Sequence, residues 1–147
     1  MFGMYNVLDI AQYIIRRCNE QNQPISNLRL QKILYFVQAE FLVSKGEPCF
    51  NERIEAWAFG PVVPEVYHRY KGYGAASIPF VTTSPFIRLL CEEDQNLIDG
   101  VIDETSKYSV TTLVEITHNQ TPWINAYRLG FNCPITNESI KAFFEED

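Results

Sequence analysis

Apolar residues recur every three or four positions along most of this chain, which is the spacing of one face of an α-helix. The first such segment covers residues 6–22, where Asn6 can cap the helix start and Pro24 lies beyond its end. The next begins at Ser26 or Asn27 and ends before Gly46. Because it is apolar on more than one side, it is predicted to be the central helix. Its expected buried positions are Leu30, Ile33, Leu34, Val37, Phe41 and Leu42.

The same spacing predicts further helices at 64–72, at 92–107, from Ser109 onward and at 137–146. Thr121 opens a short helical turn. Pro64 suits the first turn of its helix, since the fixed φ of proline fits there and its missing N–H is no loss.

Residues 53–59 alternate between small or apolar and larger side chains, which predicts a short strand that Gly60-Pro61 ends. A second short strand is expected at 86–90. The predicted fold class is therefore mainly α (α+β). We expect a single compact helical domain over residues 1–147, with about six helices and a small antiparallel β element near 53–59 and 86–90.

Composition agrees with a soluble globular protein. The chain has 147 residues, of which 46% are hydrophobic and 20% charged, so one domain with its own core is expected. No run of 18 apolar residues occurs, and the N-terminus lacks the features of a signal peptide. The four cysteines have no C-x-x-C spacing, which favours free, buried thiols of a cytoplasmic protein. They are Cys18, Cys49, Cys91 and Cys133.

Charge is spread unevenly along the chain. Residues 1–88 carry nine basic and seven acidic side chains, 9 − 7 = +2, whereas residues 89–147 carry three and eleven, 3 − 11 = −8. An acidic half lacks the basic stripe that binds nucleic acid non-specifically. It is either a solvated acidic face or a surface that attracts a basic partner.

The motifs of common enzymes are not found in the sequence. Its two histidines, His68 and His118, lie far apart, and neither paired cysteines nor a G-x-S-x-G motif occurs. The acidic run at 92–94 is explained by the positive end of a helix. We therefore expect no catalytic residues, no metal and no cofactor.

One stretch, EAWAFGPVVPEVYHRYKGYG at residues 55–74, is unusually rich in aromatic side chains. Tyrosine and tryptophan beside an arginine are typical of protein-binding hot spots. The candidate partner-binding residues are Trp57, Tyr67, Arg69, Tyr70 and Tyr73. The alternative is that some of the tyrosines pack against the predicted strand and build the domain.

Two motifs together point to a known family. LRLQKILYFVQAEFLVSKGEPCF at 28–50 contains L-Q-K-x-L-Y, and the next segment contains W-x-x-G-P-V-V-P at 57–64. The combination resembles the Panacea domain, also called the SocA-like antitoxin domain and first met in phage-associated proteins. Pro122-Trp123 and the apolar residues from Ile140 to Phe144 fit the same plan, so the resemblance covers about residues 5–145.

The resemblance implies a non-enzymatic, cytoplasmic antitoxin that neutralises a cognate toxin protein, encoded by an adjacent gene, through direct contact. An acidic C-terminal half would suit a basic toxin. A second hypothesis is an adaptor that delivers the toxin to an ATP-dependent protease, and a third is an unrecognised small enzyme. Members that bind DNA carry an added module, so we expect no direct nucleic-acid binding and no membrane association here.

Overall fold

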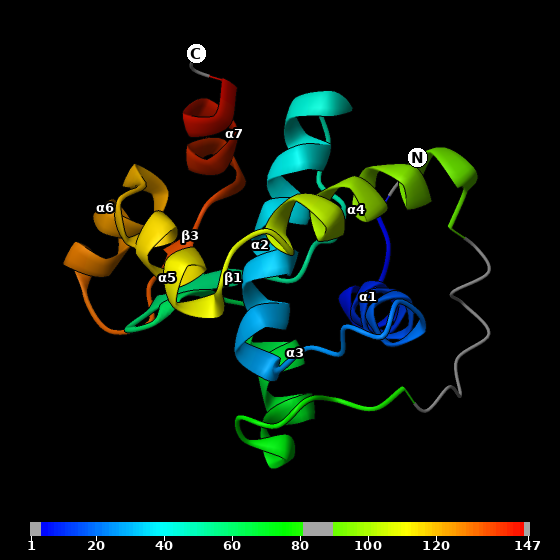
Figure 1. Cartoon of the computed structure of the whole chain (residues 1–147). Helices are drawn as coiled ribbons and strands as arrows, with labels where there is room; N and C mark the ends of the chain where they lie inside the picture. The colour runs from blue at the N-terminus through cyan, green and yellow to red at the C-terminus, as the bar shows by residue number, and fades with distance from the viewer. Residues whose placement is uncertain (1–3, 81–89, 146–147) are drawn as a thin grey trace.

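The computed structural model describes residues 4–80 and 90–145, and it is mainly helical, as the sequence predicts (Figure 1). Seven α-helices, one 3-10 helix (η1) and three strands lie within these residues. In chain order they are α1 (Val7–Glu20), α2 (Asn27–Ser44), β1 (Ile54–Trp57), β2 (Gly60–Val62), α3 (Pro64–Tyr70), η1 (Lys71–Tyr73), α4 (Glu92–Thr105), α5 (Val110–His118), α6 (Thr121–Leu129), β3 (Pro134–Ile135) and α7 (Asn137–Glu145).

Helix α2 runs through the middle of the molecule and contacts α1, α3, α4, α5, α7 and β2 (Figure 1). The Ser26 hydroxyl caps its start by accepting a hydrogen bond from the Arg29 N–H at 3.3 Å. Gly46 follows its end with φ +76°, a conformation that glycine adopts without a Cβ penalty. The central position predicted for this helix is confirmed.

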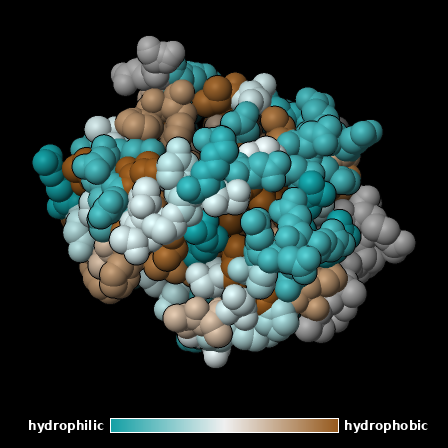
Figure 2. All heavy atoms as spheres, viewed as in Figure 1, coloured by the Kyte–Doolittle hydropathy of each residue, from teal (hydrophilic) through white to brown (hydrophobic). Residues whose placement is uncertain are grey.

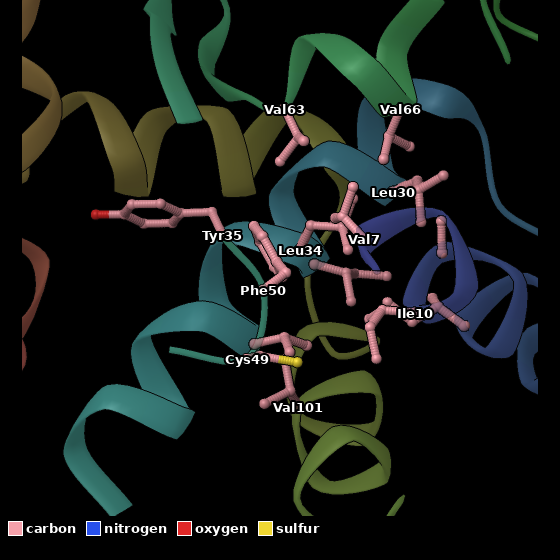
Figure 3. Close-up of a cluster of buried hydrophobic side chains, with 14 of the residues drawn as sticks. Val7, Ile10, Leu30, Leu34, Tyr35, Cys49, Phe50, Val63, Val66 and Val101 are labelled. Carbon is pink, nitrogen blue, oxygen red and sulfur yellow. The ribbon is translucent and has the colours of Figure 1, made fainter. Parts of the chain in front are cut away.

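Most of the buried apolar side chains of the described residues form one cluster around α2. Leu30 and Leu34 on α2 meet Val7 and Ile10 on α1, and Phe50 fills the space beside them (Figure 3). Each fully buried side chain of this size contributes about 1.5–3 kcal/mol relative to an exposed one. The predicted buried face of α2 is confirmed, because all six of its expected residues are buried.

The β element differs in its pairing from the prediction. Strand β1 lies between β2 and β3 and pairs antiparallel with both. The predicted second strand at 86–90 falls outside the described residues except for Leu90, which is not in a strand. The sequence predicts that Gly60-Pro61 ends the strand, but these residues begin β2. The chain turns back before them, and Pro61 pairs with Ala56 of β1. Proline is tolerated because β2 is an edge strand, where one N–H needs no partner.

The cysteines are also more varied than predicted. All four are free thiols, and Cys18 and Cys49 are buried, but Cys91 is exposed and Cys133 half-buried. Cys91 immediately precedes α4, at a helix end that faces solvent. Within the described residues, no helix has both the length and the apolar character needed to cross a membrane.

Candidate partner-binding surface

The two sequence motifs contact each other in space. Gln31 on α2 accepts a hydrogen bond from the Val63 N–H at 2.9 Å, at the residue that precedes α3. Its amide donates to Asn27 Oδ1 at 2.9 Å, and the Asn27 amide donates to the Tyr67 carbonyl at 3.1 Å. Side chains of α2 therefore satisfy two backbone groups at α3: the Val63 N–H just before the helix and the Tyr67 carbonyl within it. This fixes the direction in which α3 presents its aromatic residues.

Lys32 holds the β1–β2 hairpin in a similar way. Its ammonium is buried and donates to the Pro61 carbonyl at 2.8 Å. Burial lowers the pKa of Lys32 to about 7, because the charged form loses its hydration. Gly60 adopts φ +108°, and a Cβ at this position would lie 2.8 Å from both Lys32 Cε and Thr117 Oγ1. The polar residues of the L-Q-K motif are thus structural.

The outer side of the hairpin is held by α5 and α6. The Trp123 indole N–H donates to the Trp57 carbonyl at 2.8 Å. His118 Nε2 lies 2.9 Å from the Ala58 carbonyl, and since a carbonyl only accepts, this nitrogen carries the proton. The hairpin is therefore bound to three helices and forms a rigid base for the residues beside it.

The predicted contact residues separate into two groups. The first contains Trp57 and Tyr67, both half-buried, whose ring centroids lie 5.0 Å apart in an edge-to-face arrangement. The Trp57 indole N–H also donates to Glu55 at 2.9 Å. These two residues pack on each other across β1 and α3, so part of their contact area serves the domain itself.

The second group contains Arg69, Tyr70 and Tyr73, which line a hollow of about 200 Å³ together with Gln12 and Phe80. Tyr70 packs against the core, and burial raises the pKa of its phenol. Arg69 is exposed, and Tyr73 is 42% exposed. The tyrosine ring centroids lie 6.5 Å apart. This group offers aromatic edges and one guanidinium to solvent, which suits the binding of a protein side chain.

Sequence reasoning missed one residue of the hollow and two strongly exposed aromatic residues. Gln12 comes from α1 and joins the hollow only through folding, and its buried Oε1 has no hydrogen-bond partner among the described residues. Phe59 at the hairpin turn is 65% exposed, and Phe131, in the loop between α6 and β3, is 93% exposed. Such isolated aromatics leave no periodic signal in the sequence. The unusual exposure of Phe131 next to Gly130 becomes apparent only in the structure.

Both histidines make contacts within the domain. His68 contacts the rings of Trp57 and Tyr67, and His118 bonds to the hairpin backbone. Among the described residues, no group of three His, Cys, Asp or Glu side chains could hold a metal ion.

Comparison with known proteins identifies the family. The family model described as "Antitoxin SocA-like, Panacea domain" matches residues 30–124, which include both motifs. The chain is 34% identical over 124 residues to the protein named Antitoxin SocA from Caulobacter vibrioides (strain NA1000 / CB15N). The match covers 78% of this chain and 66% of that relative, just under two thirds of its length. No solved structure is significantly similar. The chain belongs to the SocA-like antitoxin family and carries its Panacea domain.

Proposed function

We propose that this protein is a cytoplasmic antitoxin that neutralises a cognate toxin, encoded by an adjacent gene, through direct protein–protein contact. The observation that carries the proposal is the similarity to an antitoxin over most of the chain. The contact would occlude the active or substrate-binding surface of the toxin. The contact surface proposed is the α3–η1 surface, defined by Trp57, Tyr67, Arg69, Tyr70 and Tyr73.

The geometry of this surface supports binding rather than catalysis. Lys32 is fully buried outside this surface, and its side-chain nitrogen is committed to the Pro61 carbonyl inside the domain. The exposed members of the surface, Arg69 and Tyr73, are of the residue types that dominate protein interfaces. Because the hairpin and α3 are anchored to α2, they lose little freedom on binding, which favours affinity.

Co-expression tests the proposed function. Induction of the neighbouring gene should stop growth, and the present protein should restore it. A complex of the two should then be recovered from the cells. If the neighbour is harmless, or if growth is not restored, the proposal is wrong. The lifetime of the toxin separates the mechanisms, since sequestration leaves it unchanged and delivery to a protease shortens it.

The first prediction concerns the contact surface. The double change Tyr73→Ala with Arg69→Glu should weaken toxin binding at least about tenfold while leaving the fold intact, because both side chains are exposed. Binding is measured by calorimetry and folding by thermal unfolding. Tyr127→Ala is the matched control, since Tyr127 is 45% exposed and lies on α6. Equal affinity of the double variant and the control would place the contact elsewhere.

A further inference from the structure

A second concave surface lies between α2, α4, α5 and α7. It is on the second half of α2, towards the opposite end of this helix from the α3–η1 surface. We call it the α2–α4 groove, and its volume is about 560 Å³. Phe36 and Val43 line it from α2, Leu97 from α4, Ile116 from α5 and Phe144 from α7. Val43 is 42% exposed, and the other four are half-buried. Figure 2 shows brown apolar side chains among hydrophilic ones on the face that carries these helices.

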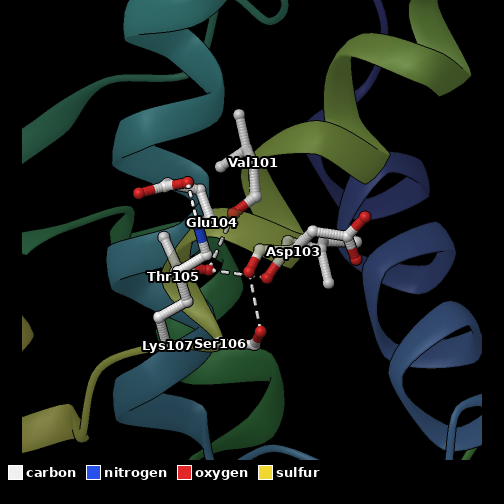
Figure 4. Close-up of polar contacts among 7 residues, drawn as sticks. Val101, Asp103, Glu104, Thr105, Ser106 and Lys107 are labelled. Atoms are coloured by element: carbon white, nitrogen blue, oxygen red, sulfur yellow. Dashed lines mark hydrogen bonds and ion pairs between the residues drawn. The ribbon is translucent and has the colours of Figure 1, made fainter.

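The charged side chains that line this groove are both acidic. Glu40 and Glu104 are among its lining residues, and none of the described lining residues is Lys or Arg. Lys107 lies beside the groove and pairs with Glu104 at 2.9 Å, as Figure 4 shows at the end of α4. Both partners of this pair are more than half exposed, so the pair contributes little and Glu104 can exchange its partner. The groove therefore favours an occupant with positive charge at its edges.

Gly100 on α4 is a second, independent reason to regard the groove as a binding site. It lies in the middle of α4 and lines the groove, yet no described atom beyond its own neighbours lies within 4 Å of where a Cβ would stand. A glycine inside a helix weakens the helix, and here the packing of the domain does not require one. What its missing side chain provides is close access to the α4 backbone from the groove.

We propose that the α2–α4 groove binds an amphipathic helix of a partner protein. The apolar face of that helix would pack on Phe36, Leu97 and Ile116, with its backbone crossing α4 at Gly100. Lysine or arginine side chains at its edges would face Glu40 and Glu104. Helices that lie in apolar grooves bind through residues spaced three and four apart, and Leu97 to Glu104 gives such a helix about 10 Å of contact along α4.

The charge argues against a second copy of this chain as the occupant. A symmetric dimer through the groove would bring Glu40 and Glu104 of one copy against those of the other. The whole chain also carries a net charge of −6. The proposal is independent of whether the α3–η1 surface binds a toxin.

The probe for the test is a fluorescein-labelled Leu/Lys peptide of about four helical turns, with leucine at helical spacing. Binding to the full-length protein is followed by fluorescence anisotropy. Two control peptides are used, one with the same composition but alternating leucine and lysine, and one helical Leu/Glu peptide. The helical Leu/Lys peptide should bind, and both controls should bind at least about tenfold more weakly. Absence of binding, or equal binding of the alternating peptide, would overturn the proposal.

Variants of the groove locate the binding. Gly100→Leu should fill the groove and weaken binding about tenfold or more, while Gly100→Ala should stay within about threefold and raise the melting temperature. Val43→Lys adds an exposed positive charge at the groove and should weaken binding without touching the core. If Gly100→Leu fails to fold, peptide binding by Val43→Lys alone tests whether the groove is the binding site. Unchanged binding in the folded groove variants would refute the assignment. The Tyr73→Ala and Arg69→Glu variant should bind the peptide normally, whatever its effect on a toxin.

Discussion

Lys32 is held in an environment that disfavours its charged form. Its side chain is fully buried, and its single hydrogen bond in the described structure goes to the carbonyl of Pro61. A neutral amine can make the same bond, since it keeps two N–H donors. The burial that lowers its pKa to about 7 therefore makes the stability of the fold depend on pH near neutrality.

The prediction for Lys32 follows from the direction of this shift. Its pKa is about 7 in the folded protein and about 10.4 in the unfolded chain, so between these values the unfolded chain holds more protons. The free energy of unfolding should therefore rise with pH, by up to about 1.4 kcal/mol per unit between pH 7.5 and 9. Lys32→Met should remove this rise. Urea unfolding of both proteins across that range measures it, and parallel pH profiles would contradict the prediction.

At the scale of elements, the β1–β2 hairpin depends on a close approach that only glycine permits. Gly60 begins β2 directly above Lys32 and Thr117, so α2 and α5 meet the hairpin backbone at this point. Pro61 then pairs with Ala56, and Gln31 receives the Val63 N–H. The path of four consecutive residues is thus determined by side chains from elsewhere in the chain.

Gly60→Ala should destabilise the protein by about 2–4 kcal/mol, from the strained φ and from the displacement of Lys32 and Thr117. Gly46→Ala is the control, since Gly46 also has a positive φ but no described atom within 4 Å of a Cβ. That change should cost only about 1 kcal/mol. Denaturant unfolding gives both values, and equal losses would show that the close contact with Lys32 carries no energy.

Local sequence signals explain which elements could be predicted. Helix starts at Asn6, Ser26 and Ser109 were predictable because each side chain caps the helix that follows. The pairing of β1 with Pro134–Ile135 was not predictable, because a two-residue strand about 80 positions away leaves no alternating pattern.

Buried polar residues were the other limit of prediction. Gln31 and Gln38 are polar and so look like surface positions. Both are buried, and their amides are satisfied by hydrogen bonds to backbone groups distant in sequence. The aromatic stretch supplied five candidate contact residues but did not separate the exposed ones, Arg69 and Tyr73, from the others. The packing of Tyr67 on Trp57 of β1 agrees with the alternative that some of the tyrosines pack against the strand. The hollow lined by Arg69, Tyr70 and Tyr73 also needs Gln12 from α1, which no local pattern connects to this stretch.

At the scale of the whole molecule, the two proposed surfaces lie towards opposite ends of α2. Figure 1 places α3 beside the start of this helix, whereas the groove is lined by its second half. Because the two surfaces are separate, a toxin on the α3–η1 surface would leave the α2–α4 groove free for a partner helix. Three of the four helices that line the groove, α4, α5 and α7, belong to the acidic half of the chain, whereas Arg69 lies on α3.

Asp94 connects three distant parts of this molecule, and it makes global stability sensitive to acid. It is buried at the first turn of α4 and accepts hydrogen bonds from Lys45 at 2.6 Å and from the Tyr5 hydroxyl. Burial alone would raise the pKa of Asp94, but the hydrogen bonds from Lys45 and Tyr5, with one from Cys91, bring its pKa below the ordinary value. A carboxyl pKa that is lower in the folded protein than in the unfolded chain stabilises the fold at pH values above the unfolded pKa. This stabilisation is lost as the pH falls through the folded pKa.

The free energy of unfolding should therefore fall below about pH 4, and Asp94→Asn should flatten that fall. At neutral pH the same change should cost about 2 kcal/mol, because it leaves Lys45 and Tyr5 without their charged acceptor. Glu104→Gln is the control, since its pair with Lys107 is exposed and contributes little to stability. Urea unfolding at pH 3 to 7 measures both variants. If Asp94→Asn and Glu104→Gln behaved alike, the buried pair would not couple the N-terminal segment, α2 and α4.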